Sequence, residues 1–154
     1  MSLWRWATQA WAADGVSEAC LELQDAAGQN PALLIWAAWC AATGRTPDED
    51  TLDDACDTAR AWQDKAIAPL RAVRRALKTR APDLDDIARE AVRAEVKAVE
   101  LAAERHLLEA LEALAPPPSG PVREALPGLV AAARRWSPTT PRQALTRLAE
   151  RLPA

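Results

Sequence analysis

The sequence predicts an all-α protein, a single-domain helical bundle built around one fully buried central helix. The composition favours helix formers and is poor in β-branched residues, and no run alternates with the period of two that a half-buried strand requires. Residues 31–42 carry no polar side chain, and a helix that is apolar on every side must be buried on every side. A chain of 154 residues is long enough to bury one good core.

The central helix is predicted over residues 31–43, and both of its ends are marked. Asn30 can cap the first turn with its side-chain oxygen, and Pro31 takes the first helical position, where its missing N–H costs nothing. Gly44 suits the left-handed residue that closes a helix. At about 1.5 Å per residue the helix is about 20 Å long, well short of a ~30 Å membrane core. Because the chain has no Phe or Tyr, Trp36 and Trp39 are expected to fill the core.

Capping residues and helix breakers predict the neighbouring helices. A first helix starts after Ser2, and Ser17 caps a second one over residues 18–27. A fourth helix opens at the capping box of residues 46–49. Pro69 is expected to kink this helix or to restart it as a fifth one.

Residues 83–114 contain no Gly or Pro and predict one long helix. In projection its first part has one broad apolar face, formed by Leu84, Ile87, Ala88, Ala91, Val92, Ala94, Ala98, Val99 and Ala102. Beyond Ala103 the apolar residues are Leu107, Leu108, Leu111 and Leu114, rotated toward the formerly polar side. A straight helix packed on one partner cannot satisfy both patterns. The helix therefore either bends near residues 104–106 or meets a second partner with its far end, which would be the C-terminal helix or another chain.

The chain is expected to divide into three parts. Residues 1–115 form the helical core domain, and residues 116–121 form a Pro-rich, extended linker. Residues 122–154 form a C-terminal helical appendage, with a weak helix interrupted by Pro127 and a last helix opened by a capping box at Thr140.

The net charge of −3 argues against nucleic-acid binding by the surface as a whole. Acidic and basic blocks alternate along the chain, which is typical of neighbouring helices that attract one another. An exposed basic patch for an anionic partner is the alternative. The three cysteines form no disulfide framework, and we expect a cytoplasmic location.

The pattern with most resemblance to a catalytic motif is formed by Asp53, Asp54 and Asp57. This D-D-x-x-D spacing places acids on one helix face, and prenyl-chain-handling enzymes use such a motif to hold Mg²⁺ and a diphosphate. A solvated acidic face is the simpler interpretation. His106 is the only histidine, and nothing in the sequence brings it to Cys20 or Cys56. We therefore assign no catalytic residue and no cofactor.

Arg71, Arg74, Arg75 and Lys78 recur at helical spacing and form one basic stripe. The stripe would contact an acidic protein surface or phosphates, and pairing with the acidic fourth helix is the simpler interpretation.

The chain resembles an uncharacterised bacterial family known as domain of unknown function 2390. The resemblance covers about residues 3–114. The residues that carry it include Leu3-Trp4, Cys20-Leu21, Leu23-Gln24-Asp25, Gly28, Asn30, Leu33-Leu34, Trp39, Gly44, Trp62, Pro69-Leu70-Arg71, Val73-Arg74-Arg75, Leu77-Lys78 and Glu100-Leu101. It implies a helical protein and no known activity, substrate or catalytic residue.

Three functional hypotheses remain open. The leading one is a non-enzymatic interaction or adaptor protein that binds a protein partner or itself. Its contact surfaces would be the basic stripe and an exposed Leu face formed by Leu107, Leu111 and Leu114. The alternative is a small-ligand-binding protein or enzyme with a Trp-lined pocket and the carboxylates of Asp53, Asp54 and Asp57. The third is RNA contact through the basic stripe.

Overall fold

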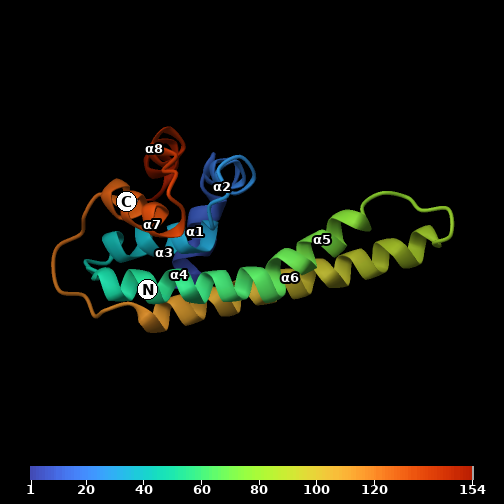
Figure 1. The fold of residues 1–154 in the computed structure, drawn as a ribbon, viewed down its shortest axis with the longest axis horizontal. Helices are drawn as coiled ribbons and strands as arrows, with labels where there is room; N and C mark the ends of the chain where they lie inside the picture. Colours follow the sequence, from blue (N-terminus) through green and yellow to red (C-terminus); the bar gives the residue numbers. More distant parts are fainter. Residues whose placement is uncertain (154) are drawn as a thin grey trace.

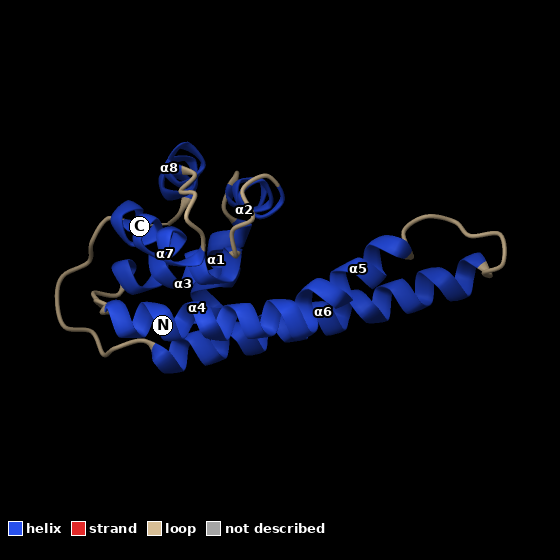
Figure 2. Cartoon of the chain, viewed as in Figure 1, coloured by secondary structure: helices blue, strands red, loops and turns tan. Residues whose placement is uncertain are grey.

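The computed structural model describes residues 1–153, and these contain helices and loops only (Figure 2). The molecule has two parts (Figure 1). A body of short helices holds both chain termini, and a two-helix arm extends away from it. We define the arm as residues 68–102, which include α5 (Ala68–Ala76), the following loop and the first half of α6 (Asp86–Leu114). No helix within residues 1–153 combines the length and the apolar character needed to cross a membrane.

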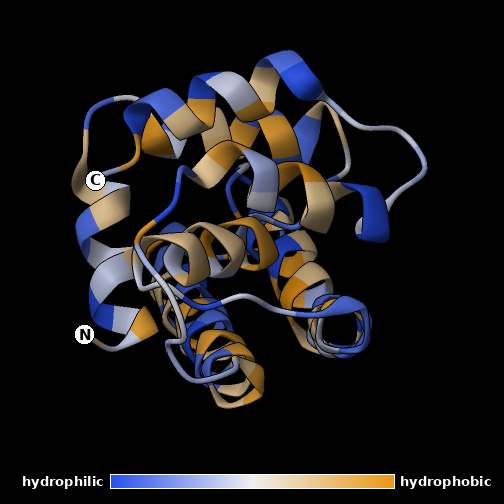
Figure 3. Ribbon diagram, turned by 90° about the vertical axis from the view of Figure 1, so that its left-hand side faces the viewer, coloured by the Kyte–Doolittle hydropathy of each residue, from blue (hydrophilic) through white to orange (hydrophobic). Residues whose placement is uncertain are grey.

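The predicted central helix is present as α3 (Pro31–Ala42), and residues 32–41 of it are all buried. Asn30 caps it by accepting a hydrogen bond from the Leu33 N–H at 3.0 Å. Gly44 has a φ of +69°, as its predicted role requires. Trp36 and Trp39 are at most 1% exposed and fill the core. Figure 3 shows this hydrophobic helix with the other helices around it.

Two helices precede α3, namely α1 (Leu3–Ala12) and α2 (Val16–Asp25). Ser2 caps α1 as predicted, by accepting from the Arg5 N–H. The predicted Ser17 cap of α2 is wrong, because the helix starts earlier, after Gly15 in a left-handed conformation. The Ser17 hydroxyl instead donates to the Trp11 carbonyl at 3.1 Å.

Helices α4 and α5 form one continuous rod. In it α4 (Glu49–Trp62) leads through a π-helical turn, η1 (Gln63–Ile67), into α5. The helix starts after Asp48, which accepts from the Thr51 N–H at 2.8 Å, so the predicted cap lies two residues too early. Pro69 lies in the first turn of α5, directly after the π-helical turn, where its missing N–H is accommodated without ending the rod.

Helix α6 is continuous from Asp86 to Leu114, with no break near residues 104–106, where a bend is one of the two predicted alternatives. Asp85 caps it by accepting from the Ala88 N–H at 2.9 Å, which starts the helix three residues later than predicted. The far end of α6 packs against α1, α3 and α4. The second partner that the Leu pattern predicts is therefore the body of the same chain.

The C-terminal helices α7 (Ala125–Trp136) and α8 (Arg142–Arg151) join the same hydrophobic core as residues 1–115. Helix α7 packs on α3, and α8 packs on α2 and α7. Pro127 lies in the first turn of α7 and does not interrupt it. The predicted cap at Thr140 is also wrong, since Pro141 precedes α8 and no side chain caps it. The predicted appendage is thus an integral part of one domain.

The Pro-rich linker is extended, as predicted, but it lies against the body. The Gly44 carbonyl oxygen accepts hydrogen bonds from the amides of Ser119 at 2.9 Å and Gly120 at 3.1 Å. The Arg45 guanidinium donates to the Pro116 carbonyl at 2.8 Å. These contacts fix the path of the chain from α6 to α7.

Candidate interaction surface

The predicted Leu contact surface is buried, so that part of the hypothesis is wrong. Leu107 and Leu111 have no solvent exposure, and Leu114 is half-buried at the end of α6. They lie where α6 enters the body and form part of its core. The rotation of the apolar pattern marks the point where the helix changes partner within the same chain.

Part of the basic stripe forms ion pairs inside the arm. Arg74 Nε lies 2.5 Å from Glu100 Oε2, and Arg71 Nε lies 3.4 Å from Glu100 Oε1. Arg75 is exposed and lies 3.6 Å from Asp25 of α2. The stripe therefore pairs with acids of α6 and α2, not with the fourth helix.

The side of α6 that packs in the arm is largely charged. Its residues are spaced alternately three and four apart and are all buried or half-buried: Asp86, Arg89, Arg93, Val96, Glu100 and Ala103. Arg89 is 7% exposed and donates to the Leu77 carbonyl at the end of α5. We call this side the seam. Its charged residues are held by ion pairs and, at Arg89, by the hydrogen bond to a carbonyl at the C-terminal end of α5.

Burial also affects the charged groups at the base of the arm, next to the seam. Burial raises the pKa of Glu104, and the neighbouring Glu100 carboxylate raises it further. Arg71 and Arg74 act in the opposite direction. The pKa of Arg74 is itself raised, chiefly by its hydrogen bond to Glu100.

The broad apolar face of α6 lies opposite the seam and is exposed along its whole length. The exposed fraction is 83% for Ile87, 53% for Val99 and 48% for Val92. We define the outer face as the exposed set Leu84, Ile87, Ala88, Ala91, Val92, Ala94, Ala98, Val99, Leu101 and Ala102. Apart from Glu95, which lies among these residues, the exposed surface is apolar, and such a helix face indicates a contact with another molecule.

The orientation of α6 follows from the side chains that α5 offers it. Arg71 and Arg74 point toward α6, so the acids Glu100 and Glu104 face them. Turning the apolar face inward would bury these arginines against hydrocarbon without a counter-ion, which is strongly unfavourable. The outer face is therefore held outward by the ion pairs on the opposite side.

The acids of the D-D-x-x-D pattern do not form a site. Asp53, Asp54 and Asp57 are exposed, and Asp53 pairs with Arg135 of α7 at 3.0 Å. Trp36 and Trp39 are buried in the core whereas the three acids are exposed, so the structure does not bring together the residues on which that alternative is built. Among residues 1–153 no group of three His, Cys, Asp or Glu side chains is placed to hold a metal ion.

The cysteines and the histidine do not form a nucleophile–base pair among the contacts of the described residues. His106 is exposed, stacks on Trp62 and contacts Glu109 at 3.2 Å. Burial raises the pKa of Cys20 and of Cys56 to about 11, so neither is a ready nucleophile at neutral pH.

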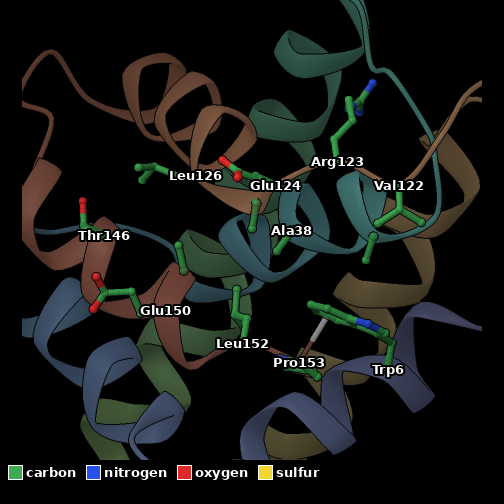
Figure 4. A pocket seen from close by; sticks show the side chains of 13 residues that line it. Trp6, Ala38, Val122, Arg123, Glu124, Leu126, Thr146, Glu150, Leu152 and Pro153 are labelled. Carbon is green, nitrogen blue, oxygen red and sulfur yellow. The ribbon is translucent and has the colours of Figure 1, made fainter.

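Among the surface cavities of residues 1–153, one lies on the body and another at the base of the arm. The first, of about 600 Å³, lies between Trp6 of α1, Ala38 of α3 and Thr146 of α8 (Figure 4). The Thr146 hydroxyl is already used, since it donates to the Arg142 carbonyl. Both cavities are lined mainly by apolar surface.

The second cavity, of about 610 Å³, lies between α2 and the base of the arm. Several of its polar side chains are also paired, since Gln63 accepts from Asn30 at 2.9 Å and Arg71 lies 3.9 Å from Glu104. The outer face of the arm is therefore the stronger candidate for a functional surface.

Comparison with curated proteins gave no match, and comparison with solved structures gave none either. A family model described as "Protein of unknown function (DUF2390)" matches residues 2–111, which include the central helix, the arm and nearly all of α6. The match confirms the resemblance seen in the sequence, and the chain belongs to this family.

Proposed function

We propose that this chain is a non-enzymatic interaction protein that binds another protein through the outer face of its arm. The observation that carries the proposal is the orientation of α6 in the arm, which is the opposite of that of an ordinary amphipathic helix. Its charged side is packed in the seam, and its apolar side faces solvent. A helix presenting such a face is a common recognition element, because a partner can bury it in a groove or against a second helix.

The arm is suited to this role because its shape is fixed before binding. The Arg74–Glu100 pair and the bond from Arg89 to the Leu77 carbonyl hold α5 and α6 together. A preformed surface loses little conformational entropy on binding. Arg75 of α5 and Lys78, in the turn after it, are exposed and would contact acids at the edge of a partner.

The same geometry gives less support to RNA contact. Phosphate binding requires several free cations on one surface. Arg71 and Arg74 are paired with Glu100 and Glu104, which leaves only half of the basic stripe for such a role.

A cytoplasmic location is part of the proposal. Cys20, Cys40 and Cys56 are all free and buried. Free thiols are typical of proteins in reducing compartments, where disulfides are rare.

The proposal is tested by photo-cross-linking in living cells. A photoreactive amino acid replaces Val99 of the outer face or, as the control, Gln9, which is exposed on α1 of the body. We expect discrete cross-linked protein species from position 99 and none from position 9. The absence of adducts at position 99, or the same adducts at both positions, would contradict the proposal.

A further inference from the structure

We propose that the partner of the outer face is a second copy of this chain, whose α6 lies antiparallel on the first across a two-fold axis. This inference rests on the proposed function and adds the identity of the partner and its register. It is argued from the spacing, the size and the charge of the exposed residues of α6.

The first argument is spacing. Five exposed residues of α6 follow one another at intervals of three and four, which is the spacing of a coiled-coil contact: Ile87, Ala91, Ala94, Ala98 and Leu101. The seam toward α5 has the same spacing on the opposite side of the helix. Helix α6 is therefore patterned to lie between two helices, and the structure holds only one of them along the arm.

The second argument is the order of large and small side chains. An axis between residues 92 and 93 brings Ile87 onto Ala98 of the second copy and places Leu101 beside the turn that precedes its α6. At the centre Ala91 faces Ala94 of the second copy, and these small side chains let the two helices approach closely. Because the same contacts occur twice about the axis, the pairing closes on itself and forms a dimer.

The third argument is charge. Glu90 and Lys97 are exposed and lie along the same edge of the outer face, seven residues apart. Glu90 also contacts Arg89 at 2.8 Å and Arg93 at 3.5 Å within its own helix. The antiparallel register places Glu90 of each copy opposite Lys97 of the other, whereas a parallel pair would oppose like charges. Among the described residues Lys97 has no ion-pair partner. On the opposite edge, Glu95 meets Ala88 of the second copy, so no like charges are brought together.

The shape of the chain leaves room for the antiparallel dimer. The arm extends away from the body (Figure 1), so antiparallel arms place the two bodies at opposite ends. The two α6 helices overlap over residues 86–99, about 21 Å at about 1.5 Å per residue. Since one helix from each copy makes most of the contact, the dimer is expected to dissociate on dilution.

The test is the molar mass of the full chain by sedimentation over a wide range of concentration. We expect a reversible rise from the monomer mass to twice that mass. Ala94→Glu, at the centre of the contact, should remain monomeric at all concentrations. The matched control, Ala113→Glu, changes an exposed alanine near the body end of α6 and should dimerise like the wild type.

Charge reversal tests the register. Glu90→Lys or Lys97→Glu alone should each weaken the dimer by roughly tenfold, because attractive pairs become repulsive. The double variant restores both pairs and should recover most of the affinity. Circular dichroism of each variant confirms that the helices are intact.

A wild-type chain that stays monomeric throughout would overturn the inference, and so would unchanged dimerisation of Ala94→Glu. Failure of the double variant to recover would overturn the antiparallel register. If the chain is monomeric while position 99 cross-links to a different protein, this inference fails and the proposed function stands. If there is neither a dimer nor an adduct, both fail.

Discussion

The Arg74 guanidinium and the Glu100 carboxylate form a bidentate pair inside the arm, with Nε to Oε2 at 2.5 Å and Nη2 to Oε1 at 3.3 Å. Glu100 is only 6% exposed and also lies 3.4 Å from Arg71. This carboxylate joins α5 to α6 and thereby determines which side of α6 faces solvent. The interaction surface proposed above depends on this pairing.

Replacing Glu100 by Ala should destabilise the protein by about 3 kcal/mol, because two arginines lose their counter-ion in a largely desolvated seam. We do not expect a larger loss of stability, since Arg71 and Arg74 keep some contact with water. Urea unfolding measures it. The control is Glu95→Ala on the exposed side of the same helix, which should change stability by less than about 0.5 kcal/mol. Equal losses in the two variants would show that the seam is not packed as described.

Asn30→Ala should cost about 1–2 kcal/mol, because the Leu33 N–H loses its cap at a buried helix end. The variant also loses the hydrogen bond from Asn30 to Gln63. Asn30→Ser keeps a capping oxygen and should lose clearly less stability in thermal unfolding. A serine variant as unstable as the alanine variant would assign the loss to the Gln63 contact.

Gly44→Ala should destabilise the protein more than Gly28→Ala does. Both glycines have positive φ, +69° and +64°, so each alanine bears a similar backbone penalty of about 1–2 kcal/mol. A Cβ at Gly28 meets open space, whereas one at Gly44 collides with the Gly120 carbonyl oxygen of the linker. Comparing the two unfolding free energies isolates the linker contact. Similar losses would mean that the linker does not lie against Gly44.

Glu104→Gln should stabilise the protein at neutral pH. The pKa of Glu104 is raised by burial in the folded state, so folding favours the protonated form. Such a group lowers stability as the pH rises from its unfolded pKa through its folded pKa. The gain of the variant should therefore be present at neutral pH and disappear below the usual pKa of Glu. Urea unfolding at several pH values measures this, and a gain that does not change with pH would contradict it.

The parts of the fold that depend on neighbouring residues could be predicted from the sequence. The central helix and its Asn30 and Gly44 ends are correct, because capping and left-handed turns are decided within a few residues. The starts of α4 and α6 are displaced by two or three residues, because several Asp and Thr residues there are chemically able to cap and only Asp48 and Asp85 do.

The parts of the fold that depend on distant residues could not be predicted from the sequence. Periodicity shows that α6 has an apolar face, but it does not show what that face meets. The outcome depends on Arg71 and Arg74, about thirty residues away, which attract the charged side of α6. In the same way the Pro-rich linker suggests separation, whereas amides of Ser119 and Gly120 bind the Gly44 carbonyl and bring α7 into the core.

The orientation of α6 is tested most directly by the reactivity of two engineered thiols on opposite sides of the helix, in dilute solution. Ile87 is 83% exposed on the outer face, and Val96 is half-buried in the seam. The native thiols are buried and give a low background. We predict that the cysteine of Ile87→Cys reacts rapidly with a maleimide and that of Val96→Cys reacts slowly. Faster reaction at position 96 would show that the apolar face is packed inside the arm and would contradict the account.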